Sequence, residues 1–185
     1  MKNKFPYKGN IVTVTKDMCD MNGHMNVSYY SKVFDEGGFE LYKDLGFSWD
    51  NETIRSEFST FTLEENIRYL KENLLGEKII PCYRIVNVNR KLIHQAAVLL
   101  NDKEEVSAIS EVLLIHIDMV KRKSTPFSDD SFERIKEFYD KAKTKPISEV
   151  IDDLLDTMQE TKDKITYEDN VVELFPSKEE DDTIH

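Results

Sequence analysis

The sequence has few of the residues that crosslink a chain and no segment that would carry it through a membrane. Only two cysteines, Cys19 and Cys82, occur in 185 residues, which allows at most one bridge and excludes a secreted fold stapled by disulfides. No apolar run approaches the roughly 20 residues that a membrane-spanning helix needs. The first ten residues, MKNKFPYKGN, lack the apolar core of a signal peptide. We therefore expect a cytoplasmic protein that does not bind membranes.

The sequence also has no excess of basic residues. Its 36 Asp and Glu outweigh 25 Lys and Arg and give a net charge of −11. Residues 149–185 hold 13 of these acids and three lysines, so residues 1–148 retain 23 acids and 22 bases. Nucleic-acid binding depends on a basic surface, and the balance argues against it. The nearly neutral part of the chain is compatible with a phosphate-bearing ligand.

The hydrophobic pattern predicts a strand, a long helix and then a run of strands. Residues 8–18 alternate polar and apolar side chains, as a strand does. Apolar residues then recur every three or four positions, which predicts a helix of about four turns that begins at Asn26 or Ser28 and ends at Gly46. Residues 58–119 alternate again in four segments separated by polar turns. We expect an α+β fold with one buried helix against a curved antiparallel sheet.

Two glycines lie on the apolar stripe of the predicted helix. Gly37 and Gly38 each cost the helix up to about 1 kcal/mol relative to alanine. Such a cost indicates that another part of the chain passes close to this face, and a sheet wrapped around the helix would supply the reason.

The composition changes after residue 128. Residues 129–143 and 147–162 each show helical spacing of apolar side chains, and Pro146 separates them. We therefore divide the chain into a domain of residues 1–128 and an acidic, helical C-terminal extension of residues 129–185.

The turn between the first strand and the helix concentrates groups that can do chemistry. Within CDMNGHMN, the carboxylate of Asp20, the imidazole of His24 and the carboxamide of Asn26 precede the helix start. Unpaired N–H groups and a partial positive charge at a helix start can stabilise an oxyanion. Asp20 could then act as a general base toward water or as a nucleophile.

A purely structural interpretation of the same turn has to be weighed against this one. Asp, Asn and Gly are ordinary turn residues, so Asp20 and Asn26 could serve only to satisfy backbone N–H groups while Gly23 turns the chain.

The motif and its surroundings resemble a known family. The stretch DMNGHMNVSYYSKVFDEGGFELYKDLGF is similar to the signature of hotdog-fold acyl-CoA thioesterases of the 4-hydroxybenzoyl-CoA thioesterase type, in which Asp-x-x-Gly-His-x-Asn precedes a long central helix. FSTFTLEENIRYLKE and IHIDMVKRKSTPF resemble the second half of the same fold, so the similarity covers residues 7–128. Within the family, the chain looks closest to the betainyl-CoA thioesterase branch.

The resemblance implies roles for individual residues of the turn. The catalytic carboxylate of the family matches Asp20, and the N–H that polarises the thioester carbonyl falls near Val27. His24 and Asn26 match the motif and would orient the water, the carboxylate or the loop.

The resemblance also implies a coenzyme A contact and an assembly. A basic pair at a hairpin turn, which contacts coenzyme A phosphates in relatives, matches Arg90 and Lys91. Relatives of this type are homodimers or homotetramers with active sites between subunits, and we expect the same here.

A second carboxylate occurs in the strand that begins at Phe58. Strict alternation places Glu64 on the face opposite Phe61 and Leu63, with Glu65 on the apolar side. Hotdog enzymes often bring an acid from a facing strand or subunit near the thioester, so Glu64 or Glu65 could share the catalytic work. The alternative is an ordinary solvated strand glutamate.

The remaining candidates are weaker. His94 and His116 lie in apolar strands, where a hydrogen-bonded core or interface histidine is the commoner outcome. Histidines and cysteines show no metal-ligand spacing, so we expect no metal, and no cofactor beyond the coenzyme A of the substrate. If the substrate carries a quaternary ammonium, Tyr29, Tyr30 or Trp49 could bind it through their aromatic faces.

The expected function is hydrolysis of a small or medium acyl-CoA thioester, with betainyl-CoA as one candidate substrate. A non-catalytic acyl-CoA-binding or regulatory protein with the same fold is the main alternative. Dehydratase chemistry is a third option, but its His–Glu arrangement and proline-rich loop are absent from the sequence.

Overall fold

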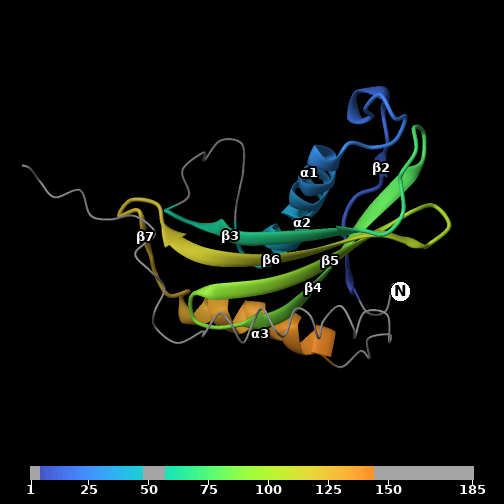
Figure 1. Ribbon diagram of the computed structural model, residues 1–185. Coiled ribbons are helices and arrows are strands. Elements are labelled where there is room, and N and C mark those ends of the chain that lie inside the picture. The colour runs from blue at the N-terminus through green and yellow to red at the C-terminus, as the bar shows by residue number, and fades with distance from the viewer. Residues whose placement is uncertain (1–4, 48–56, 144–185) are drawn as a thin grey trace, which may run out of the picture.

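The computed structural model describes residues 5–47 and 57–143 and shows a helix pair packed on a long antiparallel sheet (Figure 1). In chain order the elements are β1 (Tyr7–Lys8), β2 (Val12–Thr13), the short 3-10 helix η1 (Lys16–Met18), α1 (Val27–Gly37), α2 (Phe39–Asp44), β3 (Phe58–Tyr69), β4 (Lys78–Val88), β5 (Leu92–Leu100), β6 (Val106–Asp118), β7 (Lys123–Ser124) and α3 (Asp129–Lys143).

The sheet has the strand order β1-β4-β5-β6-β3, and every pairing in it is antiparallel. β2 adds to β4, and β7 adds to β6. The tight turns between β4, β5 and β6 make neighbours of consecutive strands, as expected for antiparallel pairing. The four strands predicted within residues 58–119 and the α+β class are therefore confirmed.

The predicted first strand is wrong in its extent. In place of one strand over residues 8–18, the chain makes only β1 and β2, which pair with different parts of β4. Gly9 lies just after β1, and its N–H donates to the Pro81 carbonyl at 2.8 Å. A Cβ at Gly9 would lie 2.5 Å from the Gly37 carbonyl oxygen, so this segment passes directly under the helix.

The predicted helix is also interrupted. α1 and α2 replace one continuous helix, and the break lies at Gly38, whose N–H donates to the Asp35 carbonyl three residues back at 3.1 Å. A three-residue step tightens the last turn of α1. Of the two predicted helix starts, Asn26 is the N-cap, and the predicted stop at Gly46, which has φ of +94°, is confirmed.

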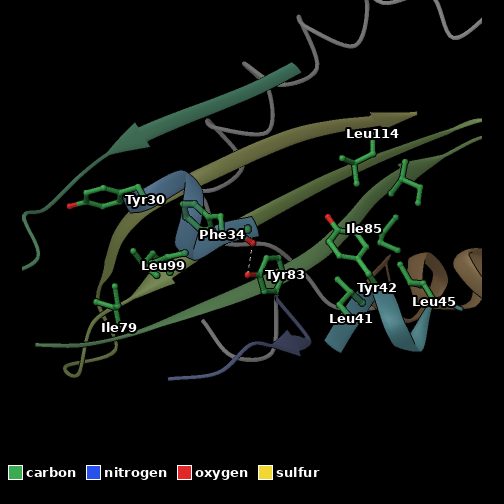
Figure 2. Close-up of a cluster of buried hydrophobic side chains, with 14 of the residues drawn as sticks. Tyr30, Phe34, Leu41, Tyr42, Leu45, Ile79, Tyr83, Ile85, Leu99 and Leu114 are labelled. Carbon is green, nitrogen blue, oxygen red and sulfur yellow. Dashed lines mark hydrogen bonds between the residues drawn. The ribbon is translucent and has the colours of Figure 1, made fainter. Parts of the chain in front are cut away.

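The close approach predicted at the helix glycines is real. A Cβ at Gly37 would lie against the Pro81 ring and 2.5 Å from the Tyr83 hydroxyl oxygen. That hydroxyl donates to the Phe34 carbonyl at 2.8 Å, the hydrogen bond drawn in Figure 2. Burial raises the pKa of Tyr83 and keeps it a neutral donor. The absent side chain at Gly37 therefore lets α1 lie directly on β4.

The main core fills the space between the helices and one face of the sheet (Figure 2). A second cluster, which includes Cys82, Ala96, Val98, Leu100 and Ile109, occupies the opposite face, because side chains alternate along each strand. The buried members of the main core include Tyr30, Phe34, Leu41, Tyr42 and Leu45 from the helices, and Ile79, Tyr83, Ile85, Leu99 and Leu114 from the strands.

α3 packs beside β4 and confirms the helix predicted for residues 129–143. Its Ile135 side chain is fully buried in the main core. The Phe138 ring stacks on Tyr7 with 4.8 Å between ring centroids, and the Tyr7 hydroxyl donates to the Phe138 carbonyl at 3.1 Å. Burial raises the pKa of Tyr7 to about 12. The helix predicted for residues 147–162 lies outside the described residues.

Candidate active site

The turn that carries Asp20 is closed by main-chain hydrogen bonds. The Asp20 N–H donates to the His24 carbonyl at 3.2 Å, and the Gly23 N–H donates to the Asp20 carbonyl at 3.1 Å. Gly23 has φ of +83°, a conformation that disfavours residues with a side chain. Cys19 and Met25 pair across the base of the turn. The loop therefore fixes Asp20 beside the start of α1.

The Asp20 carboxylate is half-buried and partly used by its own loop. Its Oδ1 accepts a hydrogen bond from the Asn22 N–H at 2.8 Å. Within the described part of the chain, the other carboxylate oxygen makes no hydrogen bond. One oxygen thus orients the side chain, while the second can accept a proton from a bound molecule. Both interpretations of the turn, structural and catalytic, agree with this geometry.

The start of α1 presents a backbone donor. The Asn26 Oδ1 accepts from the Ser28 N–H at 3.1 Å and from the Ser28 hydroxyl at 2.7 Å, and the Tyr29 N–H donates to the Asn26 carbonyl. Among residues 5–47 and 57–143, no acceptor pairs with the Val27 N–H. Val27 is also exposed. A donor at a helix start that lacks a partner is suited to hold an anionic oxygen.

His24 lies in the same turn, but no hydrogen bond joins its ring to the Asp20 carboxylate. Its half-buried ring has Nδ1 at 3.4 Å from the Met25 carbonyl oxygen, which is a weak contact. The main chain of His24 also forms an isolated antiparallel β-bridge with Leu74, and the Met25 N–H donates to the Asn73 carbonyl at 2.8 Å. The turn is therefore fastened to the connection between β3 and β4.

Arg90 and Lys91 lie at the far end of the sheet. His24, just before the helix start, pairs with Leu74, which precedes β4, whereas the Arg90–Lys91 turn follows the last residue of β4. Within one chain the length of β4, about 30 Å at ~3.3 Å per residue, therefore lies between them. Arg90 forms an ion pair with Asp129 at 2.6 Å and stacks over Phe132 at 4.4 Å. One chain alone does not bring this pair to Asp20.

The alternation predicted for β3 is wrong because the strand contains a bulge. The register shifts between Thr62 and Glu64, so that Leu63 is an extra residue. Glu64 pairs with Leu113 and shares the face of Phe61, away from the helices, instead of lying opposite Phe61. The structure therefore separates Glu64 from the Asp20 turn within one chain.

Glu65 instead faces α1. It pairs with Val112 on the helix side of the sheet, and its Oε2 accepts a hydrogen bond from the Ser31 hydroxyl at 2.7 Å. Of the two strand glutamates, Glu65 is the one that lies beside the helix carrying the Val27 N–H. The second carboxylate near the helix is therefore Glu65.

A cavity of about 450 Å³ lies between α1 and the sheet, and it contains polar residues that the sequence did not single out. Ser28, Ser31 and Asp35 line it from the helix, while Gln95 and Ser110 line it from the strands. Partial burial raises the pKa of Asp35, and the charges of Glu36 and Glu65 raise it further. The sequence did contain a signal for these polar lining residues. Ser28, Ser31 and Asp35 follow helical spacing, and Gln95 interrupts an apolar strand.

The other histidines are structural within the described chain. His94 pairs with Glu111 on the face of the sheet away from the helices, and His116 Nδ1 lies 2.8 Å from the Thr125 carbonyl oxygen. Residues 5–47 and 57–143 hold no group of three His, Cys, Asp or Glu side chains arranged to bind a metal ion. None of the helices in these ranges is long and apolar enough to cross a membrane.

Comparison with known proteins gives consistent matches. The family model described as the thioesterase-like superfamily matches residues 14–152. The betainyl-CoA thioesterase of Pseudomonas aeruginosa is 26% identical over 137 residues, which cover 74% of this chain and 86% of that protein.

Solved structures show the same fold. A Staphylococcus aureus protein determined in complex with CoA superposes with a TM-score of 0.67 at 26% identity, covering 77% of this chain and 87% of that one. The DHNA-CoA thioesterase of Staphylococcus aureus superposes with a TM-score of 0.63 at 19% identity, covering 75% and 91%.

Proposed function

Because the chain belongs to the thioesterase-like superfamily and is a thioester hydrolase, we propose that it cleaves a small acyl-CoA, with Asp20 as the base that activates water. The observation that carries this proposal is the Val27 N–H at the start of α1, which has no acceptor among the described residues, together with the half-buried Asp20 in the turn that leads into that helix. Together they supply an oxyanion donor and a proton acceptor on one rigid turn.

The reaction follows from the positions of these two groups. Asp20 takes a proton from water as the water oxygen bonds to the thioester carbon, and the carbonyl oxygen becomes an oxyanion beside the Val27 N–H. The positive end of the α1 dipole stabilises that charge. The carbon–sulfur bond then breaks, coenzyme A leaves as a thiolate, and the proton on Asp20 passes to it. No metal or further cofactor enters this route.

A complete site needs a second copy of the chain in this proposal. Arg90 and Lys91 lie at the opposite end of β4 from the Asp20 turn, so they reach the coenzyme A phosphates of the same substrate only from another subunit. A homodimer or homotetramer meets this requirement. The CoA complex of the Staphylococcus aureus protein supports a coenzyme A ligand for the fold.

The acyl group proposed is betainyl, the trimethylammonio-acetyl group. The similarity to the betainyl-CoA thioesterase of Pseudomonas aeruginosa supports it. Tyr30 is an unsuitable partner for a cation, because it is buried, its hydroxyl accepts from Asn73 at 3.1 Å, and its ring meets Tyr69 edge-on. Tyr29 is half-buried at the helix start, and Trp49 lies outside the described residues.

A variant at Asp20 tests the catalytic assignment. We expect Asp20→Asn to lower kcat at least about a hundredfold, since the amide cannot take the proton from water while it still fits the turn. Thiol release from betainyl, short-chain, long-chain and aromatic acyl-CoAs measures the effect. Asp17→Asn is the matched control, because Asp17 is an exposed acid in η1 that lies outside the turn. Full turnover by Asp20→Asn on every substrate would contradict the proposal.

A further inference from the structure

The cavity under α1 combines an open rim with a closed, polar floor. Ser28, Lys32, Thr62 and the two acids Asp35 and Glu65 are exposed and mark the open side, while Tyr42, Gln95 and Ser110 are buried. Its volume of about 450 Å³ falls within the range of small-molecule sites. Ser28, one residue after Val27, is the first residue of α1 that lines the cavity, which continues from there along the helix.

The charges around this cavity are predominantly negative. Asp35 and Glu65 line it from the helix and from β3. Among the described residues Lys32 is the only basic one in the lining, and its Nζ lies 3.7 Å from the Glu36 carboxylate. The pKa of Asp35 is raised by burial first and then by Glu36 and Glu65, so Asp35 lies in a field that disfavours negative charge. A cation placed there would relieve that repulsion.

Two buried oxygen atoms in the cavity have no partner. Gln95 is 4% exposed and Ser110 is 1% exposed, yet neither the Gln95 Oε1 nor the Ser110 Oγ makes a hydrogen bond within the described part of the chain. Buried polar atoms without a partner are rare in native proteins and call for an explanation.

We propose that this cavity binds the cationic head of the acyl group, with Glu65 and Asp35 as the two carboxylates that select a positive over a neutral substrate. The inference rests on the proposed thioesterase function and deepens it, because it names the residues that recognise the charge. A quaternary ammonium has no N–H donor, so the recognition is electrostatic and depends on the carboxylates around it.

The spacing along α1 assigns the two carboxylates to different positions of the substrate. Ser31, the partner of Glu65, is three residues beyond Ser28, about 4.5 Å along the helix, whereas Asp35 is seven residues beyond it, about 10 Å. In betainyl-CoA one methylene separates the ammonium from the carbonyl. Glu65 therefore lies level with that ammonium, and Asp35, about 6 Å farther along the helix, lies level with one on a chain about five bonds longer.

A neutral substrate of the same shape isolates the role of charge. 3,3-Dimethylbutyryl-CoA replaces the nitrogen of betainyl-CoA with carbon and has the same branching and no positive charge. We expect the wild-type enzyme to favour betainyl-CoA over this isostere at least tenfold in kcat/KM. A ratio near one, with turnover of both esters, overturns the inference and leaves the proposed function intact.

Single variants then test the carboxylates. We expect Glu65→Gln to lower the betainyl to 3,3-dimethylbutyryl ratio about tenfold and Asp35→Asn to lower it less. The order reverses with 7-trimethylammonioheptanoyl-CoA, whose ammonium is five bonds farther from the carbonyl, compared with its neutral carbon isostere. Glu40→Gln removes one exposed acid from α2 and should leave every ratio unchanged.

Each outcome has a defined meaning. The inference is overturned if the ratio of charged to neutral substrate stays at the wild-type value in both Glu65→Gln and Asp35→Asn. It is also overturned if Glu40→Gln lowers this ratio as much as they do, because the effect would then come from net charge alone. Absence of thiol release from every acyl-CoA, charged or neutral, overturns the proposed function and the inference together. Thermal unfolding of each variant identifies any that fail to fold. If one carboxylate variant fails to fold, the substrate ratio of the other variant decides whether the inference stands.

Discussion

Asp35 carries its carboxylate next to the buried side chains of Phe34 and Leu114 in the cavity wall. Its raised pKa means that the folded chain holds the charged form less readily than the unfolded chain does. Ionisation of Asp35 therefore costs stability as the pH rises from about 4 through the raised value. The negative charge that would bind a cationic ligand therefore lowers the stability of the fold, and such a conflict between binding and stability is common at binding sites.

This conflict predicts a pH-dependent gain in stability. We expect Asp35→Asn to raise the free energy of unfolding at pH 7 relative to wild type, because the neutral amide removes the cost of the charge. The gain should shrink as the pH falls toward 3, where Asp35 is protonated in both states. Urea unfolding at pH 3, 5 and 7 measures it, with Glu40→Gln as the control. A gain of equal size at all three pH values would contradict the explanation.

At the scale of elements, the contact between α1 and β4 depends on the missing side chain at Gly37. We expect Gly37→Ala to destabilise the fold by about 2 kcal/mol, because overpacking against the Pro81 ring and the Tyr83 hydroxyl outweighs the better helix propensity of alanine. Denaturant unfolding measures the loss. Glu36→Ala, on the exposed side of the same turn, should change stability by less than about 0.5 kcal/mol. A more stable Gly37→Ala chain would disprove the close contact.

Local signals account for the elements that the sequence predicted. The cap at Asn26, the stop at Gly46 and the glycines that admit β4 all act within a few residues, so their pattern is visible in the chain. The bulge at Leu63 cannot be seen in the sequence, because an extra residue in a strand changes neither the composition nor the turn signals. Its effect is seen only in the pairing with β6.

The same distinction holds for the site. The Asp20 turn lies within eight consecutive residues and could be predicted as a unit. The cavity could not, since it joins Asp35 of α1, Glu65 of β3, Gln95 of β5 and Ser110 of β6, and only the folded sheet brings these together. A polar residue in an apolar strand indicates that something lies opposite it, but the strand alone does not identify the neighbour.

At the scale of the whole molecule, a site built from two copies predicts that defective chains rescue each other. We expect Asp20→Asn chains and Arg90→Gln/Lys91→Gln chains to be weakly active alone. Mixed after unfolding and refolding, they should recover about one quarter of wild-type activity, because half of randomly formed dimers are mixed and each has one intact site.

Thiol release before and after mixing measures this recovery. Refolding each variant with itself is the control, and unfolding curves check that loss of the Arg90–Asp129 ion pair does not prevent folding. Activity after mixing that equals the average of the two separate variants would show that each chain holds its site alone.

The bulge in β3 also affects how this chain should be aligned with its relatives. Leu63 is taken up locally, so residues on both sides of it keep the faces that they would have in a strand one residue shorter. A relative that lacks this residue would still direct an acid toward α1. An alignment that omits the gap at this point would match that acid to Glu64 and would assign substrate preference to the wrong carboxylate. Insertions and deletions at position 63 should therefore be placed before the acids of this strand are compared between homologues.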